Sequence, residues 1–127
     1  GDDDRITGRI WHGVGAEDGL AFRMDAEPLL TPGPDTFDIM GCEDPTLVPT
    51  PEGFILYYTG LDEAFDAEML YAAGPDIRSL KKRGTVFKSG KTQDNTKEAT
   101  VCITQDGEWR LFYEFARNDA SLVGVAR

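Results

Sequence analysis

The feature that most constrains the fold is an internal repeat with a period of roughly 54 to 59 residues. In each copy an acidic residue precedes an apolar stretch, an acid-glycine turn and an aromatic stretch. Asp44 stands nine residues before Gly53, and Glu98 stands nine residues before Gly107. A fixed period of this length is typical of proteins that repeat one supersecondary unit. The sequence therefore predicts similar units laid side by side along the chain.

The repeated unit consists of short β-rich runs interrupted by Gly, Pro, Asp and Asn, and long helical patterns are missing. The acidic stretch Asp62–Glu68 is expected to be a loop. The predicted strands are Arg9–Val14, Pro28–Thr31, Thr46–Val48, Phe54–Thr59, Met69–Ala73, Thr85–Lys88, Thr100–Ile103, Trp109–Phe115 and Leu122–Ala126.

Four strands in a unit of about 50 residues are typical of a β-propeller blade. We expect an all-β fold and one domain over residues 1–127, a partial β-propeller of antiparallel sheets. Residues 6–32 would end one blade, 33–90 would form a complete blade, and 91–127 would form most of the next. Closed propellers need at least four blades, so the chain would belong to a longer protein or close by association. A self-contained β-sandwich stays open as an alternative.

Composition excludes several classes of function. The 127 residues carry 23 acidic and 13 basic side chains, a net charge of −10, whereas nucleic-acid binding needs a positive surface. No apolar run approaches 18 residues, so we expect no membrane span. No signal-peptide pattern opens the chain. The compartment stays open between the cytoplasm and secretion.

Metal and nucleophile chemistries are also disfavoured. No Cys/His cluster has zinc-site spacing, the single histidine is His12, and no Gly-x-Ser-x-Gly motif accompanies it. We therefore expect no metal and no organic cofactor. Cys42 and Cys102 either form one disulfide or remain two thiols, and the sequence leaves this open.

Three stretches together resemble a known family. They are G-C-E-D-P-T-L-V at Gly41–Val48, G-F-I-L-Y-Y-T-G at Gly53–Gly60 and T-K-E-A-T at Thr96–Thr100. They resemble the five-bladed β-propeller glycosidases of glycoside hydrolase families 130 and 43. The resemblance implies about two and a half blades of a five-bladed propeller. It also implies an enzyme that cleaves mannosides or arabinosides by hydrolysis, or by phosphorolysis with inorganic phosphate as co-substrate. Thr46 stands where many family 130 members carry arginine, which leaves hydrolysis or phosphorolysis open.

Asp44 and Glu98 are the predicted catalytic residues. They occupy the same place in consecutive repeats, so we expect them to face one cavity. Paired carboxylates are what glycosidic cleavage needs, because one protonates the leaving oxygen while another acts on water or stabilises positive charge. Under the family 43 resemblance, Asp44 corresponds to a residue that tunes the acid and Glu98 to the general acid. Under the family 130 resemblance, Asp44 corresponds to the proton donor.

Six further residues are expected to contact an oligosaccharide or glycoside substrate, and each also has a structural alternative as a solvated, packing or turn residue. Lys97 resembles a lysine that contacts phosphate or sugar in family 130. The predicted substrate-binding residues are Glu43, Lys97, Tyr58, Asp62, Arg117 and His12. The competing hypothesis is a non-catalytic glycan-binding or assembly module. The expected macromolecular partner is a second copy of the chain or the remainder of a longer propeller.

Overall fold

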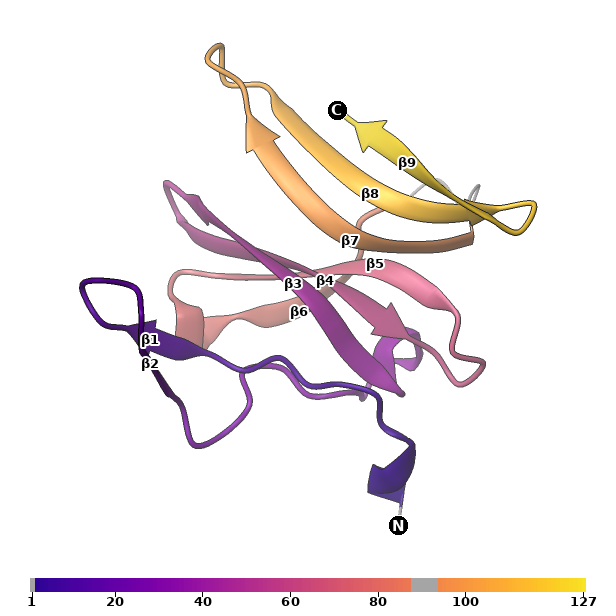
Figure 1. Ribbon diagram of the computed structural model, residues 1–127, viewed down its shortest axis with the longest axis horizontal. Coiled ribbons are helices and arrows are strands. Elements are labelled where there is room, and N and C mark those ends of the chain that lie inside the picture. Colours follow the sequence, from indigo (N-terminus) through magenta and orange to yellow (C-terminus); the bar gives the residue numbers. More distant parts are fainter. Residues whose placement is uncertain (1, 88–93) are drawn as a thin grey trace.

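The computed structural model describes residues 2–87 and 94–127, and these form three antiparallel sheets (Figure 1). The first sheet pairs β1 (Gly13–Gly15) with β2 (Phe22–Met24). The second contains β3 (Gly41–Thr50), β4 (Gly53–Leu61), β5 (Ala67–Gly74) and β6 (Lys81–Thr85). The third contains β7 (Asp94–Ile103), β8 (Trp109–Arg117) and β9 (Ala120–Ala126).

Helical structure in the described residues is limited to three single 3₁₀ turns, η1 (Asp2–Arg5), η2 (Thr36–Asp38) and η3 (Ile77–Ser79). The prediction of an all-β, antiparallel fold is therefore confirmed, while none of the described sheets closes on itself. No helix in this part of the chain has the length and apolar character to cross a membrane.

The acid-glycine turns connect the first two strands of each larger sheet. Gly53 and Gly107 have φ angles of 141° and 82°, a region that favours glycine over residues with a side chain. A Cβ atom at Gly53 would also lie 2.2 Å from the carbonyl oxygen of Gly74. The repeated glycine thus marks a turn that returns the aromatic strand onto the strand before it.

The β3–β6 sheet is covered on both faces (Figure 1). On one face the N-terminal segment contributes Ile10 and Leu30 to an apolar cluster. The residues buried with them are Cys42, Leu56, Tyr58, Leu70 and Ala72. On the other face Met69 packs against the β7–β9 sheet, whose buried side chains are Ala99, Leu111, Tyr113 and Phe115. Two apolar cores therefore flank the central sheet.

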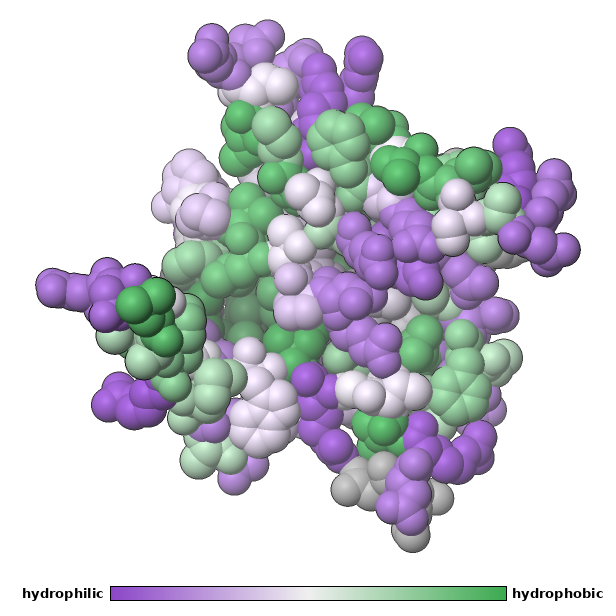
Figure 2. Space-filling view, viewed as in Figure 1, coloured by the Kyte–Doolittle hydropathy of each residue, from purple (hydrophilic) through white to green (hydrophobic). Residues whose placement is uncertain are grey.

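The β7–β9 sheet has one packed face and one exposed face, because side chains alternate along each strand. Phe112, Val123 and Val125 lie on the exposed face and are 39%, 75% and 53% accessible. Phe112 and Val125 are partners across β8 and β9. Figure 2 shows hydrophobic surface over β9 beside hydrophilic surface.

The predicted strands Thr46–Val48 and Thr100–Ile103 are shorter than β3 and β7, and two further strand predictions differ in position from the structure. The predicted strand Thr85–Lys88 is wrong, because the strand is β6 (Lys81–Thr85) and position 88 lies outside the described residues. The basic Lys-Lys-Arg run did not look like a strand, but Lys82 is drawn inward by the buried carboxylate of Asp38. The predicted pair Arg9–Val14 and Pro28–Thr31 is reduced to one bridge between Ile10 and Leu30, continued by β1 and β2.

The two cysteines are free thiols that lie in different environments. Cys42 is buried in the core, and burial is the main reason that the pKa of its thiol rises to about 12. Cys102 is exposed on β7. The structure therefore holds no disulfide between them.

Candidate functional site

Asp44 on β3 and Glu98 on β7 lie at β-bulges. Their φ angles are 49° and 56°, in the left-handed region that non-glycine residues rarely adopt. The strand register shifts between Glu43 and Thr46 and on both sides of Lys97. Bulges re-aim side chains and are frequent beside functional sites. The two acids that match in the sequence repeat thus also match in their unusual backbone conformation.

The bulged start of β7 is held against the central sheet by side-chain hydrogen bonds. The backbone N–H of Glu98 donates to Oγ1 of Thr59 at 3.2 Å. Oγ1 of Thr46 donates to the carbonyl oxygen of Ala99. Farther toward the start of β7, Oδ1 of Asn95 accepts from a backbone N–H of β5 at 2.8 Å. Glu98 is therefore positioned by neighbouring strands and not by its own strand alone.

A pocket of about 460 Å³ opens between the two larger sheets at these bulges. Its walls carry four carboxylates and the ammonium group of Lys97. The residues that line it are Glu43, Asp44, Thr59, Leu61, Phe65, Ala67, Asn95, Lys97, Glu98, Glu114, Ala116 and Ser121. The structure thus brings together both predicted catalytic residues and two of the predicted substrate-binding residues, Glu43 and Lys97.

The carboxylates of Glu98 and Glu114 have opposite acid-base tendencies. A hydrogen bond with Glu114 is the main cause that raises the pKa of Glu98, followed by burial and by the charges of Glu114 and Asp44, while Lys97 opposes the rise. Hydrogen bonds from Ser121 and Glu98 lower the pKa of Glu114. Glu98 is consequently the member of this pair that retains a proton to higher pH.

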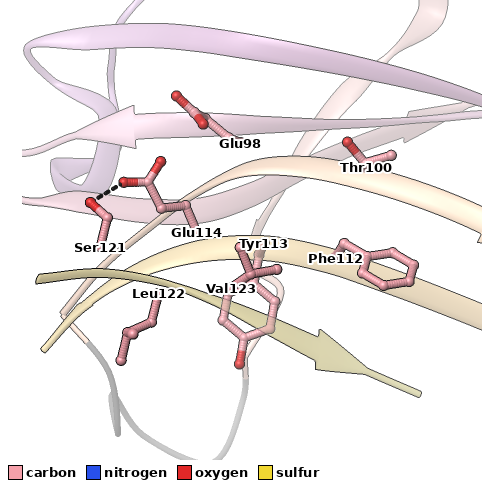
Figure 3. Close-up of a pocket in the computed structure, with 8 residues that line it drawn as sticks. All are labelled: Glu98, Thr100, Phe112, Tyr113, Glu114, Ser121, Leu122 and Val123. Atoms are coloured by element: carbon pink, nitrogen blue, oxygen red, sulfur yellow. Dashed lines mark hydrogen bonds between the residues drawn. The ribbon is translucent and has the colours of Figure 1, made fainter.

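A second pocket of about 380 Å³ adjoins the first and shares Glu98, Glu114 and Ser121 with it. Figure 3 shows the two carboxyl groups next to each other on the same side of the sheet, with Ser121 bonded to Glu114. Phe112 lies farther along the same pocket. The carboxyl pair therefore stands where a polar pocket meets a more apolar one.

Tyr58, one of the predicted substrate-binding residues, is not among the residues that line either pocket. Its side chain is 1% exposed, and its hydroxyl donates to the buried carboxylate of Asp38 at 3.0 Å. Its neighbour Tyr57 packs at the other core. Strand alternation sends the two rings to opposite faces, and both faces of this sheet are covered.

His12 also lies away from the pocket. Its Nδ1 is 2.9 Å from the carboxylate of Asp25, and Arg78 contacts the same carboxylate at 3.0 Å. Both contacts lower the pKa of Asp25, with the hydrogen bond from His12 as the largest cause. His12 therefore belongs to a group that links the N-terminal segment to the turn after β5.

Asp62 and Arg117 flank the pocket without lining it. The carboxylate of Asp62 accepts from the backbone N–H groups of Ala64 and Asp66, which closes the turn between β4 and β5. Arg117 ends β8 as an exposed residue. Their expected contact with a substrate stays a prediction.

Sequence reasoning missed Glu114 and Ser121, which come from β8 and β9. The available signal was strand pairing: Glu114 is the partner of Lys97 across β7 and β8, and Lys97 adjoins Glu98. Two bulges displace this pairing from the regular register, so counting residues from the turn does not recover it. Phe65 and Asn95, which also line the pocket, were likewise missed.

Among residues 2–87 and 94–127, no group of three or more His, Cys, Asp or Glu side chains is arranged to hold a metal ion. Comparison of the chain with models of protein families and with curated proteins finds no match.

Proposed function

We propose that this chain forms part of a β-propeller glycosidase in which Glu98 is the proton donor and Asp44 is the partner acid that acts on water. In this proposal the β3–β6 sheet is one blade, the β7–β9 sheet is most of the next, and the N-terminal segment ends a third. The meander order of the sheets and their face-to-face packing support this arrangement. The resemblance of Gly41–Val48 to the propeller glycosidases supports the chemistry.

The observation that carries the proposal is the equivalent placement of the two acids. Asp44 and Glu98 lie near the starts of consecutive sheets, and each occupies a β-bulge with a left-handed backbone conformation. Both residues line one pocket. The pKa of Glu98 is raised, chiefly by its hydrogen bond with Glu114. A carboxylic acid that keeps its proton beside a carboxylate that does not is the arrangement used for general acid catalysis of glycoside cleavage.

Cleavage then needs two proton transfers. Glu98 gives its proton to the glycosidic oxygen as the bond between that oxygen and the anomeric carbon breaks, leaving Glu98 ionised. Water forms the new bond to the anomeric carbon and gives a proton to Asp44. Release of that proton to solvent and reprotonation of Glu98 restore the starting state.

Water fits this pocket better than phosphate as the acceptor. With Glu98 protonated, three carboxylates and a single ammonium group, that of Lys97, are the charged groups among the described lining residues. Lys97 lies 3.8 Å from a carboxylate oxygen of Glu114, so its charge is already partly compensated. A phosphate dianion would meet net repulsion, whereas neutral water would not. We therefore propose hydrolysis over phosphorolysis.

The test is product release from a panel of mannosides and arabinosides, with and without phosphate, measured by chromatography on the intact protein. Glu98→Gln keeps the shape of the side chain but removes its acid. We expect kcat to fall by about 10² to 10⁴-fold, the usual contribution of a general acid. Asp44→Asn is expected to reduce kcat as well.

The matched control is Glu52→Gln, which changes an exposed acid in the turn after β3 and is expected to leave kcat unchanged. Turnover that survives Glu98→Gln would refute the role of Glu98. Sugar binding without turnover in the unmodified protein, unaffected by Asp44→Asn, would support a glycan-binding module instead.

A further inference from the structure

We propose that Glu114 is the positioning residue for the proton of Glu98: its carboxylate accepts the hydrogen bond from the protonated Glu98 carboxyl group and holds that group at the boundary of the two pockets. This inference rests on the proposed function of Glu98 and adds a residue that acts through Glu98. Glu114 itself needs no contact with the sugar.

Glu114 lies beside the bulged segment of β7 that carries Glu98, and it lies where the two pockets adjoin. It is the β8 partner of Lys97, which directly precedes Glu98 in the chain. A hydrogen bond between the two glutamates is the largest cause that raises the pKa of Glu98. Both residues line both pockets. In Figure 3 their carboxyl groups lie next to each other above the sheet. Two adjacent carboxyl groups cannot both ionise without mutual repulsion, so one proton shared between them is favoured.

Ser121 and Lys97 decide which of the two carboxyl groups is ionised. The hydroxyl of Ser121, on β9, donates to Oε1 of Glu114 at 2.7 Å. The ammonium group of Lys97 lies 3.8 Å from the same oxygen. Both interactions favour the charged form of Glu114 and lower its pKa. The proton therefore resides on Glu98.

Of the other charged groups around Glu98, Asp44 also raises the pKa of Glu98, and Lys97 lowers it by a smaller amount than the other causes raise it. From β3, the charge of Asp44 raises the pKa of Glu98, and Glu43 lines the same pocket. From its own strand, Lys97 lowers that pKa, but it is the smallest of the causes. Once Glu98 has given up its proton, two ionised carboxylates face each other, which favours the return of a proton before the next turnover.

The first experiment follows the carboxyl carbon signals of ¹³C-labelled glutamate by NMR during a pH titration of the full chain. In the unmodified protein we expect Glu98 to titrate at higher pH than Glu114. In Glu114→Gln the like charge is gone and an amide N–H can donate to ionised Glu98. The midpoint of Glu98 should therefore shift to lower pH. An unchanged or raised midpoint would overturn the proposal.

Ser121→Ala provides a second variant that leaves both carboxyl groups in place. Loss of the hydroxyl removes a donor to ionised Glu114, so the midpoint of Glu114 should rise and the two midpoints should approach each other. Unchanged midpoints in this variant would also overturn the proposal. Glu52→Gln, on a distant turn, is the control and should leave both midpoints in place.

The titration needs no substrate, so it stays informative even if the protein cleaves none of the glycosides in the panel. With an active protein, Glu114→Gln should move the alkaline limit of kcat to lower pH and leave KM unchanged. A loss of activity at every pH, with the Glu98 midpoint in place, would show that Glu114 acts in some other way. Failure of the proposed function and failure of this inference thus give different results.

Discussion

At the scale of single residues, Asp38 has the most demanding environment in the described part of the chain. Its side chain is fully buried, and its carboxylate lies 2.6 Å from the ammonium group of Lys82. The hydroxyl of Tyr58 and the N–H of Gly33 each donate to it at 3.0 Å. A buried charge is tolerated only when it is paired and hydrogen-bonded in this way. Asp38 therefore connects the segment before β3 to β4 and β6.

We expect Asp38→Asn to destabilise the protein strongly, because it leaves the mostly buried Lys82 ammonium without its counter-charge. Breaking a buried pair by changing one partner costs about 3–5 kcal/mol. Urea unfolding followed by fluorescence measures the loss. Asp66→Asn, at an exposed position, is the control. Equal unfolding free energies for the two variants would contradict this account of Asp38.

The position and the protonation of the proposed catalytic acid, Glu98, depend on residues that are not themselves acids. Glu98 is positioned through Thr59, and the preference of the proton for Glu98 depends on Ser121. Neither residue has a sequence signature of its own. Each was identified only because strands that are distant along the chain meet at the pocket.

At the scale of elements, the bulge in β7 contains Glu98 and depends on contacts with a neighbouring strand for its stability. Glu98 adopts a left-handed backbone conformation, which costs energy for a residue with a side chain. Its N–H leaves the regular ladder and is satisfied by the buried hydroxyl of Thr59 on β4. The bulge is therefore stabilised by the neighbouring sheet.

Thr59→Val keeps the shape of the buried side chain and removes the acceptor for this N–H. This hydrogen bond is partly buried, and a typical hydrogen bond contributes about 0.5–1.5 kcal/mol, so we expect the unfolding free energy to fall by that amount. The backbone amide of Glu98 should also exchange hydrogen faster, measured by NMR.

Thr100→Val is the matched control, since Thr100 is an exposed threonine on β7, the strand that carries Glu98. Substitutions at such positions usually change stability by no more than about 0.5 kcal/mol. If the two variants lost equal stability, the hydroxyl of Thr59 would not be what holds the bulge.

At the scale of the whole molecule, the two larger sheets differ in how they are covered. The β3–β6 sheet is packed on both faces, whereas the outer face of the β7–β9 sheet exposes Phe112, Val123 and Val125. Among the described residues β9 also lacks a strand partner on its outer edge. Exposed apolar faces and open strand edges favour association with another chain.

We expect the 127-residue chain to associate as its concentration rises, with elution from a size-exclusion column shifting to smaller volumes. Val125→Lys places a charge on the exposed face and should weaken that shift. Leu20→Lys, at a residue that is 86% exposed on the turn between β1 and β2, adds the same charge elsewhere and should not. Equal behaviour of both variants would mean that association does not use the β9 face.

The repeat and the turn glycines were sufficient to predict the β class, most of the strands and the equivalence of Asp44 with Glu98. These features are local: alternating apolar residues favour strands, and a glycine at positive φ marks a turn wherever it occurs. The position of β6 was mispredicted because Lys82 is held inward by Asp38, a contact between residues 44 positions apart.

The sequence by itself determined the β class, most of the strands and the equivalence of Asp44 with Glu98 in consecutive repeats. Only the tertiary structure decided that Tyr58 lies in a core, that His12 pairs with Asp25, and that Glu114 and Ser121 join Glu98 at the pocket. The physical reason is that strand alternation assigns side chains to two faces without saying which face is covered. The bulges in β3 and β7 then shift the pairing, so the neighbours of each acid depend on how the sheets pack.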